Sequence, residues 1–289
     1  MAQNCITEKP SKREHKPEVF AIDIDGTITF NDHSISEYTI SEFRNIKKDF
    51  PNIRFILVTG RSYKNAARVC HKLSITDDLL ITNNGSVLTT IHKFEPMIQN
   101  ILSQNAVEIV FEYAKKNNLA AAALYGDGEE ILIPEFITNT EEDMFAWLGD
   151  SKIVRDANKI YTENIYQLCV FGNNKLIEKT VAYFEQYGLN VWVYEREKSF
   201  ALEINGPTTN KWGMIKKYCK KNNLFINNVV VMGNGTNDVP MFENAAYSVA
   251  VNNAVPVLHD LATEICLSNE ENGVVKFIRK HLNKYYSQK

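Results

Sequence analysis

The chain has 289 residues, of which 44% are hydrophobic and 23% are charged, and its formal net charge is -3. This composition is typical of a globular protein with one large domain or two moderate ones, and the small net charge gives no indication of nucleic-acid binding. The sequence has no run of about 18 apolar residues, so we expect no membrane-spanning helix.

The cysteines are few, odd in number and far apart, and none forms a CxxC pair: they are Cys5, Cys70, Cys169, Cys219 and Cys266. A disulfide framework or a zinc site is therefore not expected, and a reducing, cytoplasmic location is predicted. Residues 1–17 are polar and charged without an apolar core. They predict a disordered tail and not a secretory signal.

The first predicted strand spans residues 19–25 and ends in Asp23-Ile24-Asp25, followed at once by Gly26-Thr27. Side chains at positions i and i+2 of a strand point to the same side, so the two carboxylates can share one site. They repel each other unless a proton or a cation lies between them. A divalent metal would remove that penalty and leave a carboxylate nucleophile beside a carboxylic acid–base.

A helix is predicted at 36–49, a second strand at 53–60 and a second helix at 63–73. The second strand ends in Thr59-Gly60-Arg61. A hydroxyl and backbone N–H groups just before a helix form an anion site, so we expect Thr59 and Gly60 to hold phosphate oxygens. For Arg61, contact with a substrate and a surface ion pair are equal alternatives.

The middle of the chain, residues 86–198, has a different pattern. Two helix–strand–strand units predict an α+β insert packed on one face of a sheet. The insert begins after one polar cluster and ends before the next. This position favours a cap that covers the site formed by the clusters; the alternative is a second domain without a role in the chemistry. Its predicted helices are 97–117 and 175–187, and its predicted strands are 119–125, 130–134, 166–172 and 189–194.

After the insert, the strand–helix alternation resumes and predicts an α/β fold with a parallel sheet and helices on both faces. Ligands of such sheets bind at the carboxyl ends of the strands, where all the polar clusters lie, so one composite site is expected. A strand at 229–235 ends in Gly-Asn-Gly and leads into Thr-Asn-Asp, so residues 233–238 read Gly-Asn-Gly-Thr-Asn-Asp. The other predicted elements are helices at 211–222, 239–244 and 273–282 and strands at 246–251 and 264–268.

Four motifs, at residues 23–27, at Thr59, at Lys211 and at 233–238, resemble those of the haloacid dehalogenase-like phosphatases, specifically the Cof-type members with an inserted α+β cap. The resemblance covers residues 19–282, and segments 80–85 and 203–207 also look like family signatures. It implies a Rossmann-like parallel-sheet core formed by residues 18–85 and 199–289, with the cap domain at 86–198 between them.

The resemblance also implies roles for single residues. Asp23 attacks the phosphorus, and Asp25 protonates the leaving alcohol and then activates water. The implied catalytic residues are Asp23, Asp25, Thr59 and Lys211. The implied phosphate or substrate contacts are Ile24, Thr59, Gly60, Arg61, Lys211 and Asn237, and the implied ligands or supports of Mg²⁺ are Asp23, Asp25, Asn234 and Asp238.

Two of these residues invite comment from physical chemistry. Lys211 opens a predicted helix. A cation is unusual there because the start of a helix favours anions, and a lysine aimed at phosphate would explain its presence; an exposed surface lysine is the alternative. Asn234 stands where the family has an aspartate that binds magnesium, so weaker metal binding is expected. Two explanations of Asn234 stay open: a change that slows turnover and keeps the shape of the site, or a variation for which Asp238 or water compensates.

The leading prediction is a magnesium-dependent phosphatase of small phosphomonoesters such as sugar phosphates, with a small phosphorylated metabolite as partner and neither nucleic acid nor membrane. The alternatives are a phosphomutase of hexose phosphates and a catalytically weakened sensor of a phosphorylated metabolite. The oligomeric state is not predicted. Candidate substrate contacts are Asn84, Glu203, Tyr125, Trp147, Trp192 and Tyr194.

Overall fold

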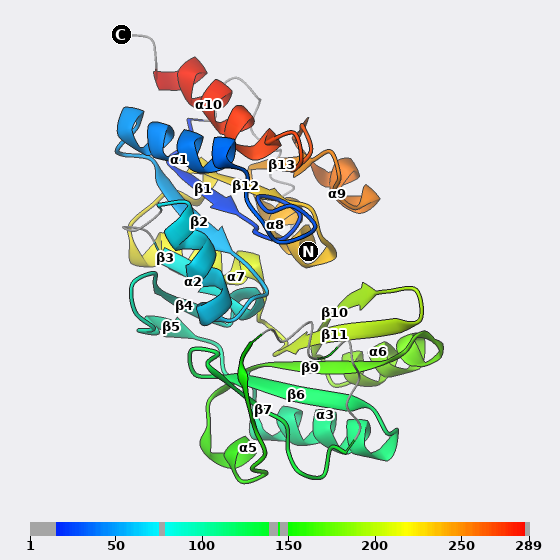
Figure 1. Cartoon of the computed structure of the whole chain (residues 1–289). Helices are drawn as coiled ribbons and strands as arrows, with labels where there is room; N and C mark the ends of the chain where they lie inside the picture. Colours follow the sequence, from blue (N-terminus) through cyan, green and yellow to red (C-terminus); the bar gives the residue numbers. More distant parts are fainter. Residues whose placement is uncertain (1–15, 75–78, 139–143, 145–149, 287–289) are drawn as a thin grey trace, which may run out of the picture. The chain divides into compact units, whose positions relative to one another are not determined.

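The computed structural model describes residues 16–74, 79–138, 144 and 150–286 (Figure 1). Nearly all of the tail predicted at 1–17 lies outside these residues, as does Trp147. Within the described segments, no helix has the length and the apolar character that crossing a membrane requires.

The first sheet contains eight strands among the described residues, in the order β14-β13-β12-β1-β2-β3-β4-β5. The pairs β12–β1 and β1–β2 are parallel, whereas β3–β4 and β4–β5 are antiparallel. The predicted α/β class with a parallel-sheet core is confirmed, and one edge of the sheet is antiparallel. The strands are β1 (Val19–Ile22), β2 (Arg54–Val58), β3 (Leu79–Thr82), β4 (Val87–Thr90), β5 (Ile98–Gln99), β12 (Val229–Gly233), β13 (Tyr247–Val251) and β14 (Glu264–Cys266).

Five of the described helices that follow these strands begin and end close to their predicted limits, and the helix at 256–261 was not predicted. Ser36 caps the first of them, because its hydroxyl accepts a hydrogen bond from the Thr39 N–H at 3.0 Å. The last extends four residues beyond the predicted end at 282. They are α1 (Glu37–Asp49), α2 (Tyr63–Lys72), α7 (Lys211–Lys221), α8 (Val239–Asn244), α9 (Pro256–Leu261) and α10 (Gly273–Tyr286), with short 3-10 turns η1 (Asn83–Gly85), η3 (Ile226–Asn228) and η4 (Thr236–Asp238).

Aromatic residues pack one face of this sheet. The Phe55 ring on β2 stacks on Phe20 of β1 with centroids 5.8 Å apart, and the Phe43 ring of α1 meets Phe55 edge-on at 5.5 Å. Such pairs stabilise a core beyond the burial of their area. The strand β1 is buried along its whole length, which is typical of a central parallel strand with helices on both faces.

The second sheet has six strands within the described part of the chain, in the order β10-β11-β9-β6-β7-β8. All pairs are antiparallel except β7–β8. Its strands are β6 (Ala120–Tyr125), β7 (Glu130–Leu132), β8 (Lys152–Val154), β9 (Ile165–Asn173), β10 (Asn190–Glu195) and β11 (Ser199–Asn205), and its helices and turn are α3 (Gln104–Lys116), α5 (Lys159–Thr162), α6 (Ile177–Glu185) and η2 (Asn174–Leu176).

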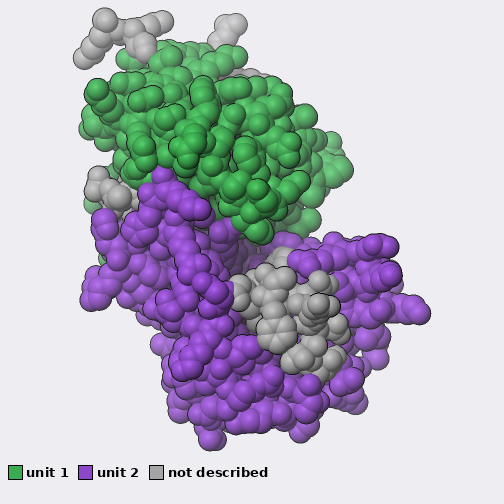
Figure 2. Space-filling view, in the orientation of Figure 1, with its two compact units in different colours: residues 1–57, 73–75, 218–289 green, residues 58–72, 76–217 purple. Residues whose placement is uncertain are grey.

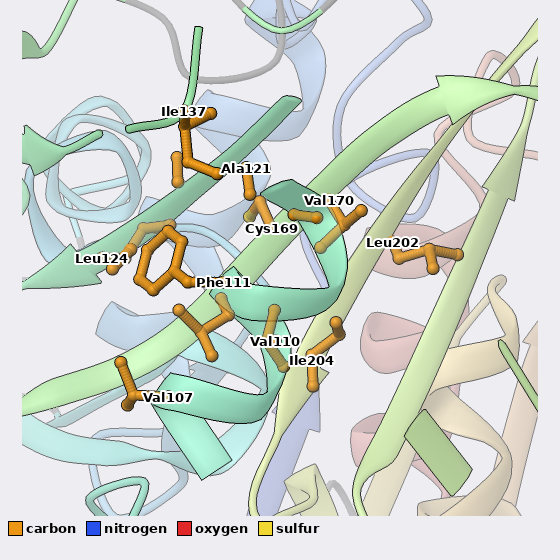
Figure 3. Close-up of a cluster of buried hydrophobic side chains, with 14 of the residues drawn as sticks. Val107, Val110, Phe111, Ala121, Leu124, Ile137, Cys169, Val170, Leu202 and Ile204 are labelled. Carbon is orange, nitrogen blue, oxygen red and sulfur yellow. The ribbon is translucent and has the colours of Figure 1, made fainter. Parts of the chain in front are cut away.

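One face of this sheet packs on α3. Leu202 and Ile204 alternate along β11 with Glu203 and lie in the same buried cluster as Val110 and Phe111 of α3 (Figure 3). Since successive side chains of a strand point to opposite faces, Glu203 lies on the face that α3 does not cover.

The helix predicted at 97–117 is wrong over its first seven residues. Residues 98–99 form β5, which pairs with β4, and α3 begins only at Gln104. Ser103 caps α3 by accepting a hydrogen bond from the Ala106 N–H at 3.2 Å. The serine hydroxyl sets the start of the helix by satisfying a donor of its first turn, and Ile98 and Gln99 before it pair in the sheet instead.

The described chain divides into two compact units, one with residues 1–57, 73–75 and 218–289 and the other with residues 58–72 and 76–217 (Figure 2). The strands change from the first sheet to the second after β5 and return to the first after β11. These positions differ from the expected limits at 86 and 198. The limits of the predicted cap domain themselves stay a prediction.

Candidate active site

The two aspartates that follow β1 have different surroundings. The Asp23 residue is 4% exposed, and its N–H donates to the Met232 carbonyl at 2.9 Å, which extends the pairing of β1 with β12. The Asp25 side chain is 41% exposed. The first carboxylate is therefore fixed and largely dehydrated, whereas the second can exchange a proton with water.

A tight turn holds both carboxylates. The carbonyl of Ile24 accepts hydrogen bonds from the N–H groups of Ile28 and Thr29, at 2.9 and 3.1 Å. Gly26 has a φ of +70°, and a Cβ at this position would lie 2.4 Å from Nδ2 of Asn234. The left-handed backbone favours glycine here, and a larger residue would have to displace the Asn234 amide.

Thr27 connects the first and last motifs. Its hydroxyl Oγ1 lies 3.0 Å from Oδ2 of Asp23 and 3.1 Å from Oδ1 of Asn234, and the residue is 1% exposed. Both neighbours are acceptors, so the single hydroxyl proton is shared between them. The motifs at 23–27 and 233–238, more than 200 residues apart, thus meet in one polar cluster.

Asp238 shapes the loop that carries Asn234. Its Oδ2 accepts hydrogen bonds from the N–H groups of Asn234 and Gly235, both at 3.0 Å, and the residue is fully buried. Asn237 is 8% exposed in the same turn, η4. Asp238 therefore positions the loop through backbone contacts, and its expected part at a metal stays a prediction.

Three side chains of this cluster were not predicted. His33 Nδ1 lies 3.1 Å from Oδ1 of Asp25, Asn253 donates to the Gly26 carbonyl at 2.8 Å, and Asn269 donates to the Thr29 carbonyl at 2.9 Å. Each comes from a loop without a repeating pattern. The only sequence signal is the closeness of His33 to the first motif.

The donor set fits a hard cation. Asp23 and Asp25 offer carboxylate oxygens and Asn234 offers its amide oxygen, and these are the ligand types that Mg²⁺ prefers. Within the described residues, no group of three or more His, Cys, Asp or Glu side chains is placed to hold a metal. With Asn234 in place of a carboxylate, a cation bound here would have one negative charge fewer among its ligands.

The other predicted site residues belong to the second unit and are described separately. Thr59 is fully buried, and its Oγ1 accepts a hydrogen bond from the Arg61 N–H at 3.1 Å. The backbone of this loop is tied to η1, because Asn84 N–H donates to the Thr59 carbonyl and Asn83 N–H to the Arg61 carbonyl, both at 3.0 Å. We call residues 59–61 the Thr59 loop.

Lys211 is the first residue of α7 and is fully buried. The alternative that it is an exposed surface lysine is therefore wrong. Burial of an ammonium group costs free energy unless polar or charged groups surround it. Gly85 packs against its backbone, since a Cβ there would lie 2.2 Å from the Asn210 carbonyl oxygen and 3.0 Å from the Lys211 nitrogen.

A profile of the haloacid dehalogenase-like hydrolases matches residues 20–278. The chain belongs to the haloacid dehalogenase-like hydrolases. The family membership that the four motifs predicted is thereby confirmed, and the polar cluster at the end of β1 is the candidate active site of a member of this hydrolase family.

Relatives and solved structures of this family cover nearly the whole chain. A 5-amino-6-(5-phospho-D-ribitylamino)uracil phosphatase of Bacillus subtilis is 25% identical over 266 residues, which is 91% of this chain and 94% of that protein. A phosphoglycolate phosphatase of Methanobrevibacter smithii is 25% identical, covering 91% of this chain and 97% of its own length. The crystal structure of a haloacid dehalogenase-like hydrolase from Bacteroides thetaiotaomicron has a TM-score of 0.77 at 23% identity and covers 92% of this chain and 99% of its own, which supports the fold.

Proposed function

We propose that this haloacid dehalogenase-like hydrolase is a Mg²⁺-dependent phosphatase of small phosphomonoesters such as sugar phosphates. The observation that carries the proposal is the contrast between Asp23, which is 4% exposed, and the Asp25 side chain, which is 41% exposed. A fixed, dehydrated carboxylate suits a nucleophile, and a carboxyl group open to water suits a proton carrier. The matched relatives named as phosphatases of a ribityl phosphate and of phosphoglycolate support the same class of reaction.

The proposed reaction has two steps. An oxygen of Asp23 attacks the phosphorus, the bond from phosphorus to the ester oxygen breaks, and protonated Asp25 gives its proton to the departing alcohol. Water then attacks the phosphorus of the aspartyl-phosphate while Asp25 accepts its proton, and the bond to Asp23 breaks to release phosphate. Each step exchanges one P–O bond for another and returns Asp23 and Asp25 to their starting states.

The remaining predicted residues bind and neutralise the phosphate in this proposal. Thr59, Gly60, Asn237 and the backbone at Ile24 supply neutral contacts, and Lys211 supplies a positive charge. Arg61 contacts either the phosphate or the rest of the substrate. Asp23, Asp25 and Asn234 would hold Mg²⁺, with Asp238 positioning the loop, and the cation would offset the negative charge of the phosphoryl oxygens. A cap at residues 86–198 and a cytoplasmic location are part of the same proposal.

The weakened sensor is the second candidate, because Asn234 brings no charge to the metal ligands. A phosphate-release screen over phosphorylated metabolites, with and without Mg²⁺, decides between the two functions. We expect release by the unchanged chain and a loss of at least about a thousandfold in Asp23→Asn.

Asp260→Asn is the matched control, because it makes the same chemical change at an exposed position of α9. Its rate should stay within twofold of the unchanged chain. Release that is absent from the unchanged chain, or equal in Asp23→Asn, would contradict the phosphatase. Isomerised sugar phosphate without free phosphate would instead support a phosphomutase.

A further inference from the structure

A row of paired residues crosses the second sheet on the face that α3 does not cover. Glu203 of β11 lies directly opposite Trp192 of β10 and Cys169 of β9, and Cys169 lies opposite Ala122 of β6. Directly opposite residues of antiparallel strands share a face. Leu202 and Ile204, which alternate with Glu203, point toward α3 (Figure 3). Glu203 is therefore the acidic member of this row, on the face opposite to Leu202 and Ile204.

The Glu203 carboxylate is fixed in place and 6% exposed. Its Oε2 accepts hydrogen bonds from Nδ2 of Asn84 at 2.6 Å and from the Tyr194 hydroxyl at 3.0 Å. The same oxygen would lie 2.8 Å from a Cβ built on Gly60. The carboxylate thus lies close against the Thr59 loop at Gly60.

Hydrogen bonds through η1 connect Glu203 to the Thr59 loop. Asn84 is part of η1, where Asn83, Asn84 and Gly85 all have positive φ, and its backbone N–H donates to the Thr59 carbonyl. The Asn84 side chain then holds Glu203. One residue therefore links the loop expected to bind phosphate to a carboxylate of the second sheet.

A carboxylate next to the Thr59 loop, which is expected to bind phosphate, favours some substrates over others. It accepts hydrogen bonds from hydroxyl groups and repels a second anionic group. Trp192, its direct neighbour, has a buried Nε1 without a hydrogen-bond partner among the described residues. The register of β10 and β11 thus places a residue with an unpartnered donor opposite a carboxylate acceptor, and a hydroxyl group can both accept and donate.

We propose that Glu203 determines specificity by binding a hydroxyl group of the alcohol part of the substrate, so that polyol and sugar phosphates are preferred to phosphate esters that carry a carboxylate. This inference rests on the proposed phosphatase function. Glu203 does not take part in the chemical steps. Its effect is on which ester binds.

The test compares two substrates of similar size, glycerol 1-phosphate and phosphoglycolate, in the full-length chain. Glu203→Gln keeps the shape of the side chain and its ability to accept from Asn84, but removes the charge. We expect the ratio of kcat/KM for glycerol 1-phosphate to that for phosphoglycolate to fall at least about tenfold, mainly through KM. A ratio is insensitive to the fraction of folded protein.

Two controls separate binding from structure. Glu195→Gln makes the same change at an exposed position of the neighbouring strand β10, and the ratio should stay within twofold. Inhibition by inorganic phosphate, which has no alcohol part, should be the same in Glu203→Gln and the unchanged chain. A weaker phosphate inhibition with a constant substrate ratio would show that Glu203 only supports the loop, and would overturn the inference.

The outcomes also distinguish the inference from the function on which it rests. If the unchanged chain and Glu203→Gln release phosphate with the same substrate ratio, within twofold, the specificity role is wrong and the phosphatase stands. If neither substrate nor any other phosphomonoester yields phosphate that depends on Asp23, the proposed function fails and the specificity role fails with it.

Discussion

At the scale of single residues, the Thr27 hydroxyl has one proton and two acceptors, Oδ2 of Asp23 and Oδ1 of Asn234. With aspartate at 234, two carboxylates would lie around this hydroxyl and repel each other whenever no cation was bound. The amide of Asn234 avoids that repulsion. We infer that Asn234 stabilises the metal-free protein and lowers its affinity for Mg²⁺, two consequences of the same missing charge.

Asn234→Asp should therefore have two effects of opposite direction. We expect Mg²⁺ to bind on the order of tenfold more tightly, because a charged ligand replaces a neutral one, and the metal-free variant to unfold at lower urea concentration. Titration calorimetry measures the first effect and urea unfolding in a chelator the second. Unchanged affinity, or greater stability without metal, would contradict this account of Asn234.

Thr27→Val should destabilise the fold by about 1–3 kcal/mol, because the methyl group leaves the buried oxygens of Asp23 and Asn234 without their shared donor. Thr27→Ser keeps the hydroxyl and should lose less than half as much. Urea unfolding at pH 7 measures both free energies. Equal losses in the two variants would show that the methyl group of Thr27, and not its hydroxyl, is what matters.

At the scale of elements, the turn η1 places three consecutive residues, Asn83, Asn84 and Gly85, in the left-handed region. Asparagine and glycine tolerate this conformation best, so the sequence Asn-Asn-Gly is well suited to it. Left-handed non-glycine residues each cost roughly 1–3 kcal/mol, which neighbouring contacts must offset. Those contacts run to the Thr59 loop and to the backbone at Lys211.

Gly85→Ala should destabilise the protein by at least about 3 kcal/mol, because the new Cβ would lie 2.2 Å from the Asn210 carbonyl oxygen. Gly126→Ala is the matched control: Gly126 also has a positive φ, of +55°, but nothing lies within 4 Å of its Cβ position. It should cost only about 1 kcal/mol. Similar unfolding free energies for the two variants would contradict the close packing at η1.

Elements next to the motifs were predictable because their local signals agree. Strand β1 is an unbroken apolar run, and Ser36 and the following residues give α1 both a cap and an amphipathic pattern. The strands β3, β4 and β11 were not predicted. Two of them, β3 and β4, pair with each other across η1, and β11 pairs with β9 and β10; all three are buried on nearly every residue, so they lack the alternation of apolar and polar residues that marks a strand.

Part of the candidate site was predictable from the same local signals. Asp23, Asp25 and residues 233–238 follow apolar strands directly, so topology alone brings the strand ends together. Asn253 and Asn269 reach the turn after Asp25 from loops. Their part depends on the precise path of those loops, which no spacing in the sequence encodes.

At the scale of the whole molecule, the second sheet carries a charged cluster of its own. The Tyr125 hydroxyl, and after it the Lys152 and Lys159 ammonium groups, lower the pKa of Glu130 from 4.5 to about 2. A lowered carboxyl pKa adds stability above the ordinary pKa, and this stability is lost as the pH falls from about 4.5 toward 2. The cluster therefore makes acid destabilise the protein.

Glu130→Gln should remove this part of the acid sensitivity. We expect the urea midpoint to fall less between pH 7 and pH 3 in the variant than in the unchanged chain. The difference should be modest, because the charged groups around Glu130 are exposed to solvent. Glu195→Gln, an exposed change in the same sheet, is the control and should follow the unchanged chain. A variant as sensitive to acid as the unchanged chain would contradict the assignment.

The central claim for the whole molecule is that Asp23 carries the phosphoryl group during hydrolysis. Borohydride reduces an aspartyl-phosphate to homoserine, so the chain can be quenched during turnover of a phosphomonoester, reduced and digested for mass spectrometry. We predict homoserine at position 23 and unmodified aspartate at position 25. Phosphate release with unmodified Asp23 in the reduced peptide, or homoserine at position 25 alone, would contradict the account.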